Sequence, residues 1–175
     1  MRLKSLILRS SLYLTFSLLW SCGLFTFSGV ALSPDVKTFS IQTFHTEVSD
    51  GPIDMPSNLT EALKEKLSRS TPLTREEKDG DIQYEGIIKS FSYRTTFSTK
   101  SDNNDTPKEV QRLTITIEVS FINRFDEEAS FKKKQFSASE DILYTENQLE
   151  KEPELVKKIF TKLVDEIYNK SLDNW

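Results

Sequence analysis

Cys22, the only cysteine of the 175-residue chain, is the first side chain whose chemistry stands out. A single thiol cannot form an intramolecular disulfide, and it cannot complete a zinc site built on paired cysteines. The residues before it begin with the cations Arg2, Lys4 and Arg9 and continue with an uncharged apolar run over residues 10–20. A positive start, an apolar run and small residues at the junction are typical of an export signal.

The immediate neighbours of Cys22 resemble the bacterial lipobox. Leu19 stands three residues before the cysteine and Ser21 directly before it, whereas Trp20 departs from the motif, in which a small residue is usual. We therefore expect residues 1–21 to be a lipoprotein signal peptide and Cys22 to carry acyl chains such as palmitate. Two or more chains would anchor the protein stably without a transmembrane helix.

The alternative interpretation of this region is an uncleaved membrane anchor. Residues 12–32 are uncharged, and about 20 apolar residues can span a bilayer. Ser, Thr and Gly are scattered through this stretch, which favours the cleaved signal. Residues 22–34 would then be a lipidated tether.

Other reactive side chains do not form a catalytic pattern. His45 is the only histidine, and the five glycines form no phosphate-binding loop. Asp79 and Asp81 flank Gly80 without the further acids of a calcium loop, so we expect a turn there. The sequence predicts no enzyme activity, no cofactor and no metal site.

The basic residues have two possible roles. Lys132, Lys133 and Lys134 fall in an expected strand, where lysines commonly protect a sheet edge from pairing with another chain. They could instead contact phosphorylated lipid headgroups, with further charge from Arg94, Lys100, Lys108 and Arg112. The candidate headgroup contacts are Arg94, Lys108, Lys132, Lys133 and Lys134.

Length and charge limit the remaining possibilities. Residues 35–175 are enough for one domain with a single core. Without the three cations of the signal peptide, 20 basic residues face 27 acidic ones, a net charge of −7. An acidic chain of this kind is a poor candidate for binding a nucleic-acid backbone.

The hydrophobic pattern predicts the elements of this domain. Alternation of apolar residues is strongest at 112–121, where Leu113, Ile115, Ile117, Val119 and Phe121 share one face. Further strands are expected at 36–44 and 81–93, and a weaker one at 128–139. Gly86 suggests a bulge or a close backbone approach in its strand. The polar residues 94–111 are expected to form a long hairpin loop.

Two helices complete the pattern. Leu59, Leu63 and Leu67 form a narrow apolar stripe, preceded by Asn58 and Glu61 at capping-box spacing. A second helix is expected to begin near Pro153 and to present a wide apolar stripe between residues 155 and 168. The order predicts an α/β fold of the α+β type, a two-layer sandwich in which two helices pack on one face of a four-stranded mixed sheet.

Whole segments of the chain resemble the LptE family of lipopolysaccharide (LPS) assembly lipoproteins, most closely the branch found in Bacteroidota. The segments, in chain order, are SPDVKTFSIQTF, LTEALKEKLSRSTPL, GDIQYEGIIKSFSY, RLTITIEVSFINRFDEE and EIYNKSLDNW. The resemblance implies an outer-membrane lipoprotein on the periplasmic side that binds LPS. It also implies a partner, the LptD-type β-barrel that the lipoprotein plugs and supports while LPS is inserted into the outer leaflet. A lipoprotein adaptor or pilot for another outer-membrane pore is the alternative.

The lipobox generates the first testable prediction. Cys22→Ala should abolish acylation and leave the chain in the inner membrane or release it, because no second anchor is expected. Ser21→Ala keeps a small residue before the cysteine and is the matched control. Membrane fractionation and mass spectrometry of the processed N-terminus test this. An outer-membrane location for Cys22→Ala, with no acyl chain on the wild type, would contradict it.

Overall fold

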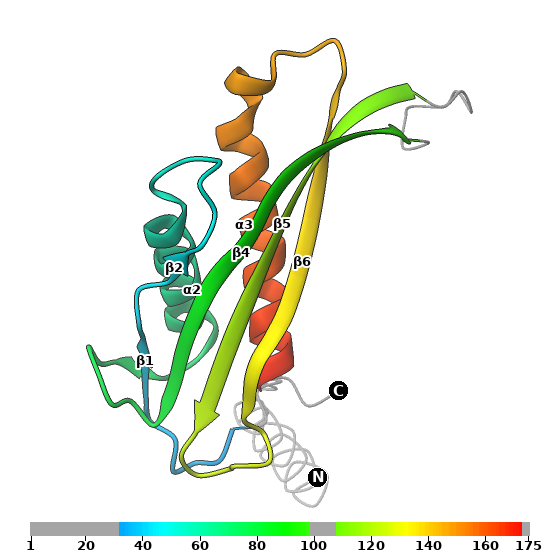
Figure 1. The fold of residues 1–175 in the computed structure, drawn as a ribbon. Coiled ribbons are helices and arrows are strands. Elements are labelled where there is room, and N and C mark those ends of the chain that lie inside the picture. The colour runs from blue at the N-terminus through cyan, green and yellow to red at the C-terminus, as the bar shows by residue number, and fades with distance from the viewer. Residues whose placement is uncertain (1–31, 99–107, 173–175) are drawn as a thin grey trace, which may run out of the picture.

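The computed structural model describes residues 32–98 and 108–172. Cys22, the predicted signal peptide and the expected polar tip at residues 101–107 lie outside these ranges. In chain order the elements are β1 (Thr38–Ile41), β2 (His45–Thr46), α2 (Met55–Ser70), β3 (Thr74–Arg75), β4 (Ile82–Ser98), β5 (Lys108–Asn123), β6 (Phe131–Leu143) and α3 (Gln148–Leu172) (Figure 1).

The strands form one mixed sheet. β4, β5 and β6 are antiparallel neighbours, β1 and β2 pair in parallel with β4, and β3 pairs in parallel with β1. The predicted fold class is confirmed, but the sheet has six strands instead of four. Of the expected strand over residues 36–44, only Thr38–Ile41 is a strand. At its far end the Phe44 amide donates to Thr60 Oγ1 of α2, at 3.0 Å, instead of to a neighbouring strand.

Strand β5 lies in the middle of the three long strands and carries the predicted core face. Leu113, Ile115, Ile117, Val119 and Phe121 are fully buried. Their even-numbered neighbours Thr114, Thr116 and Glu118 are half-buried on the other face. The alternation therefore identified both faces of this strand correctly.

A bulge in β4 exchanges its two faces half-way along. Before the bulge the buried residues are even-numbered, as at Tyr84 and Ile88. The register with β5 shifts between Ile88 and Ser90, and beyond it Phe91 and Tyr93 stand opposite the core residues Ile115 and Leu113. An extra residue in one strand reverses the facing of everything that follows, because side chains alternate with a period of two.

Gly86 gives the close approach that its position suggested, while the bulge lies beyond it. A Cβ on Gly86 would come within 3.0 Å of the Phe44 ring and 3.1 Å of the Glu118 carbonyl oxygen. Phe44 is itself buried. Gly86 thus leaves room for an aromatic ring against the sheet.

The prediction of a hairpin loop over residues 94–111 is wrong at both ends of that range. β4 continues to Ser98 and β5 begins at Lys108, with Arg94 opposite Arg112 and Phe97 opposite Glu109. Thr95, Thr96 and Phe97 favour strands, and the ladder satisfies their backbone groups, so pairing extends beyond the region where a core is available.

Helix α2 buries its leucine stripe but does not use the predicted capping box. Leu59, Leu63 and Leu67 are fully buried. The helix begins one turn earlier than the box requires, with Asp54 at the N-cap and a proline in its first turn. Asn58 lies inside the helix and donates to Asp54 Oδ2 at 2.8 Å.

Helix α3 also begins earlier than expected, at Gln148, so that Pro153 lies inside it. Its first residues are mostly exposed, whereas the stripe from Leu155 to Tyr168 is buried as predicted. Polar residues before a proline carry no apolar period, and the start of this helix was therefore not readable from the sequence.

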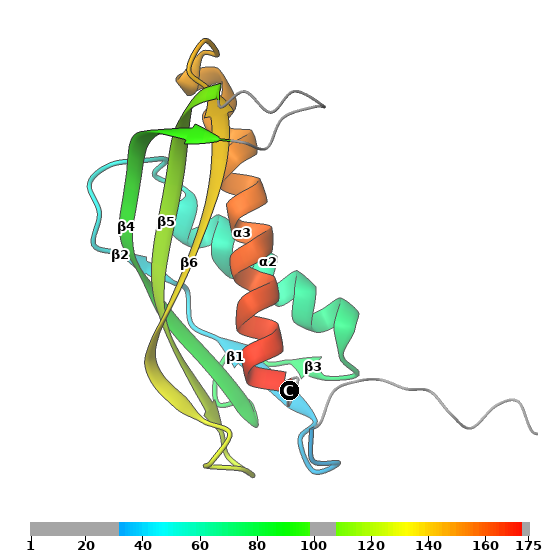
Figure 2. The same cartoon turned by 90° about the vertical axis from the view of Figure 1, so that its right-hand side faces the viewer.

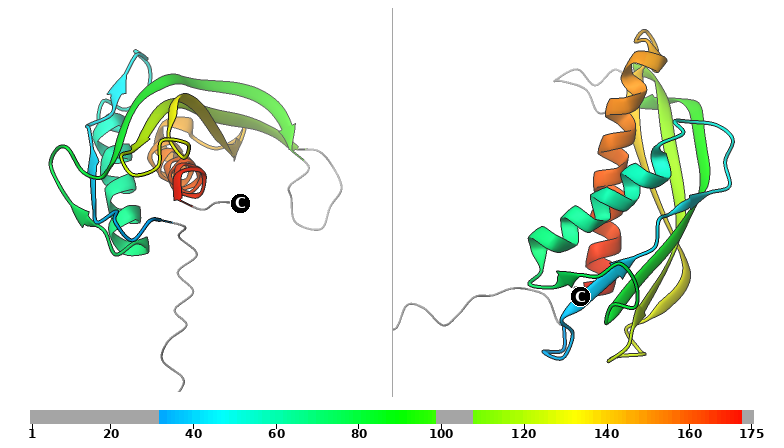
Figure 3. Two further views of the ribbon diagram at one scale, coloured as in Figure 1. Left: turned by 90° about the horizontal axis from the view of Figure 1, so that it is seen from below. Right: turned by 90° about the vertical axis from the view of Figure 1, so that its left-hand side faces the viewer.

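Both helices lie on the same side of the sheet (Figure 2). α3 packs along β5 and β6, and α2 packs against α3. Seen along the strands, the sheet curves around α3, so that its helix-free face is convex (Figure 3). The domain has one dry face and one uncovered face, as expected for a two-layer sandwich.

The facing of β5 gives the second prediction. Ile117→Ala should lower the free energy of unfolding by about 2–5 kcal/mol, since it removes a buried side chain and leaves a cavity. Thr116→Ala, one residue away on the uncovered face, should cost about 1 kcal/mol or less, chiefly for its hydroxyl contact. Urea titrations followed by circular dichroism measure both. Equal losses for the two variants would show that the facing is misassigned.

Candidate functional site

The predicted basic contacts do not gather at one place. Lys134 stands opposite Val119, whereas Asp141 and Arg94 both stand opposite Arg112, seven residues further along β5. At about 3.3 Å per residue, the lysines around Lys134 and the arginines Arg94 and Arg112 are roughly 23 Å apart along the sheet. Lys108 is the first residue of β5 and lies further toward the end of the hairpin than Arg94. The structure does not describe its side chain. The cations therefore form two groups.

The first group, Lys132–Lys134, lies on the exposed edge strand β6. The register with β5 shifts between Val119 and Phe121, and Lys133 adopts a φ of 51°. Its amide donates to Ser120 Oγ at 3.3 Å. None of the three lysines forms an ion pair within residues 32–98 and 108–172. Bulges and lysines both hinder edge pairing, and three unpaired cations can also bind an anion.

The second group centres on two arginines. Arg94 and Arg112 face each other across β4 and β5. Arg112 donates to both carboxylate oxygens of Asp141, at 2.7 and 2.8 Å, and this contact raises the pKa of Arg112. Arg94 has no ion pair with any residue that the structure describes. The row Arg94, Arg112 and Asp141 thus keeps one net positive charge.

Short hydroxyl side chains occupy the convex face next to this row, a feature that the sequence analysis missed. Two rows cross all three long strands: Ser90, Thr116 and Ser137 form one, and Ser92, Thr114 and Ser139 form the other. We call these six residues the hydroxyl face. Thr116 and Ser137 share a hydrogen bond of 3.0 Å between their hydroxyls. The β4 members line a shallow hollow of about 480 Å³ with Arg94, Arg112, Thr114 and Thr116.

The alternation in each strand could have revealed this face only with the register known. The alternation at 112–121 implies that Thr114 and Thr116 share the face opposite the apolar one, but Ser90 and Ser92 reach the same side only because of the bulge after Ile88. A parity rule without the bulge would have placed these serines in the core.

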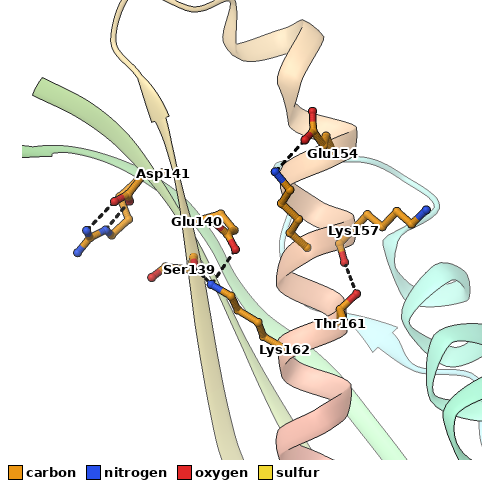
Figure 4. A network of polar contacts seen from close by, with 9 residues as sticks. Ser139, Glu140, Asp141, Glu154, Lys157, Thr161 and Lys162 are labelled. Atoms are coloured by element: carbon orange, nitrogen blue, oxygen red, sulfur yellow. Dashed lines mark hydrogen bonds and ion pairs between the residues drawn. The ribbon is translucent and has the colours of Figure 1, made fainter. Parts of the chain in front are cut away.

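Polar contacts fix α3 beside the edge of the sheet (Figure 4). Lys162 bonds to Glu140 Oε1 at 2.7 Å and to the Ser139 carbonyl oxygen at 2.9 Å. Glu154 and Lys158 pair within the helix at 2.8 Å. The Ser139 contact satisfies a carbonyl of the edge strand, so α3 partly covers the upper half of β6.

Two further ionisable groups, Tyr84 and Asp81, stabilise the fold. The Tyr84 hydroxyl is buried against Ser171 Oγ at 2.8 Å, and burial raises its pKa. Asp81 accepts from the amides of Lys37 and Thr38, both at 2.9 Å, and these bonds lower its pKa. Its carboxylate thereby ties β1 to the start of β4. His45 is exposed on β2.

Metal and membrane-spanning features are missing from the described part of the chain. Residues 32–98 and 108–172 contain no group of three or more His, Cys, Asp or Glu placed to hold a metal ion. Neither α2 nor α3 has the length and apolar content needed to cross a bilayer.

A family model confirms the resemblance seen in the sequence. The model described as LptE, lipopolysaccharide-assembly, matches residues 36–171, which is nearly all of the packed domain. The chain belongs to the LptE family. Membership assigns it to LPS assembly and to a family of non-enzymatic lipoproteins, as the resemblance in the sequence indicated. No curated protein sequence matches the chain.

The solved structures that this LptE-family chain resembles are distant from it. The minor lipoprotein of Acinetobacter baumannii is 15% identical with a TM-score of 0.43, and covers 77% of this chain and 91% of its own. The rare lipoprotein B of Shewanella oneidensis is also 15% identical with a TM-score of 0.43, at 74% and 91% coverage. CT253 of Chlamydia trachomatis is 6% identical with a TM-score of 0.48, at 79% and 99% coverage.

Proposed function

We propose that the protein is the lipoprotein subunit of an LPS-inserting complex in the outer membrane. Acylated Cys22 anchors it on the periplasmic side, and the domain plugs and supports an LptD-type β-barrel while LPS passes into the outer leaflet. The family match over residues 36–171 carries this proposal, because it covers the packed domain from β1 to the last turn of α3.

The surface of the residues that the structure describes is suited to binding a partner. Its most regular feature is a sheet face of neutral hydroxyls next to one unpaired cation, which can bind but offers no nucleophile with an adjacent base. The interior of an outer-membrane barrel is polar, so a plug needs a surface that exchanges hydrogen bonds with it. Such a subunit acts through many contacts, with the binding energy concentrated in a few of them.

Depletion of the protein tests this function. The amount of correctly assembled barrel should fall severalfold, and newly made LPS should accumulate at the inner membrane, because an unsupported barrel loses the contacts that stabilise it. Immunoblotting of the heat-modifiable barrel and fractionation of labelled LPS measure these effects. A depleted strain with normal barrel and normal surface LPS would refute the function.

LPS contact is proposed for the three exposed lysines on β6. Arg94 and Lys108 lie in the distant second group and are not part of this contact. Replacing Lys132, Lys133 and Lys134 by Gln should weaken LPS binding roughly tenfold, a loss of about 1.4 kcal/mol, because charge-assisted bonds to phosphate need cations. Lys78, Lys157 and Lys170, replaced together by Gln, form a control of equal charge. The midpoint of thermal unfolding should change little in either triple variant.

Binding of purified LPS to the domain, measured at fixed ionic strength, gives the answer. The pair Arg94→Gln and Lys108→Gln is measured separately, because the two groups lie far apart. Unchanged affinity in the triple lysine variant would leave edge protection as the role of these residues.

A further inference from the structure

The hydroxyl face differs from the other uncovered surfaces of the domain. Its six side chains are neutral and short, and each hydroxyl can both donate and accept a hydrogen bond. The outward surfaces of the helices carry long charged side chains instead, such as Lys158, paired with Glu154, and Arg69, paired with Glu65. Ordering long charged side chains at an interface costs more entropy and desolvation than covering hydroxyls that regain partners.

The arginine row beside this face has a charge left over. Like charges directly opposite each other on neighbouring strands are unfavourable, and Asp141 forms an ion pair with Arg112. Arg94 has no ion pair within the described residues and lines the same hollow as the β4 serines. A carboxylate supplied from outside would complete the row.

The shape of the face adds a third constraint. The sheet curves around α3 and presents the hydroxyl face on its convex side (Figure 3). A convex polar sheet can approach the concave inner wall of a barrel closely, because short side chains on one surface leave room for longer ones on the other. The wall of an outer-membrane barrel is lined with polar residues.

We propose that the hydroxyl face and Arg94 form the surface that docks against the inner wall of the β-barrel partner, where a wall carboxylate pairs with Arg94. The inference rests on the proposed function for its choice of partner. It adds the side of the domain that faces the wall and the chemistry of the contact.

Two substitutions with matched controls test the docking surface in the full-length lipoprotein. Thr114→Tyr adds bulk in the centre of the face, and Thr161→Tyr adds it on the exposed side of α3. Arg94→Glu reverses the unpaired charge, and Lys157→Glu reverses an exposed charge on α3. The barrel that copurifies in mild detergent is quantified by immunoblotting. Recovery should fall roughly tenfold or more for Thr114→Tyr and Arg94→Glu, and less than twofold for both controls.

Photo-crosslinking identifies what lies against the face. Benzoylphenylalanine at Ser92 should crosslink to a peptide from a barrel strand, whereas the same group at Thr161 should give at least fivefold less of that product. Thermal melts of all variants, measured on the purified domain, establish that lost recovery does not come from unfolding.

The outcomes separate the two proposals. If the wild type recovers no barrel, the proposed function fails. If the wild type recovers the barrel and the two face variants recover it equally well, the docking surface is wrong and the function stands. A crosslink from Ser92 to LPS instead of the barrel would also overturn the docking surface.

Discussion

The register of β5 with its two neighbours is the constraint on which the rest of the structure depends. Because β5 pairs along most of its length on both sides, each of its residues determines a row of three across β4 and β6. Odd-numbered residues from Leu113 to Phe121 are fully buried beneath α3. The same register places Thr114 and Thr116 in the centre of the hydroxyl face. Packing of the core and composition of the uncovered face are therefore consequences of one alignment, and a slip of one residue would exchange them.

Two bulges adapt the neighbouring strands to this alignment. In β4 the sequence Ile88, Lys89, Ser90 would break the apolar alternation, and the bulge at this point restores Phe91 and Tyr93 to the core side. In β6 the shift near Lys133 lets Phe131 stand opposite Phe121, with ring centroids 5.5 Å apart. A bulge interrupts local hydrogen bonding, and here it is offset by aromatic burial on one side of the sheet.

The sequence predicted the structure correctly wherever apolar residues recur with a regular period over a long segment and pack on the core. The alternation of β5 and the stripes of both helices were confirmed, because burial on one face imposes a period that survives in the residues themselves. β2 and β3 were missed, since a pair of exposed residues such as His45 and Thr46 has no period to detect. The capping box failed because Asp54, outside the apolar pattern, begins the helix first. The hydroxyl face was missed for a different reason: its members lie on three strands and meet only through register and a bulge.

The uncovered face then follows from what the core demands. A two-layer sandwich with both helices on one side leaves the other side of β4, β5 and β6 to water or to a partner. Water alone would favour long charged residues there, as on the helices, where they add solubility at little cost. The chain instead places serine and threonine at all six positions of the hydroxyl face. Charged residues on β5 and its neighbours stand in the rows beyond, with Arg94, Arg112 and Asp141 at one border and Glu118 at the other. Stability of the domain depends on the dry side, so the composition of the other side is free to serve contact. The docking surface proposed for this LPS-assembly lipoprotein would therefore use the face of the sheet that the core does not need.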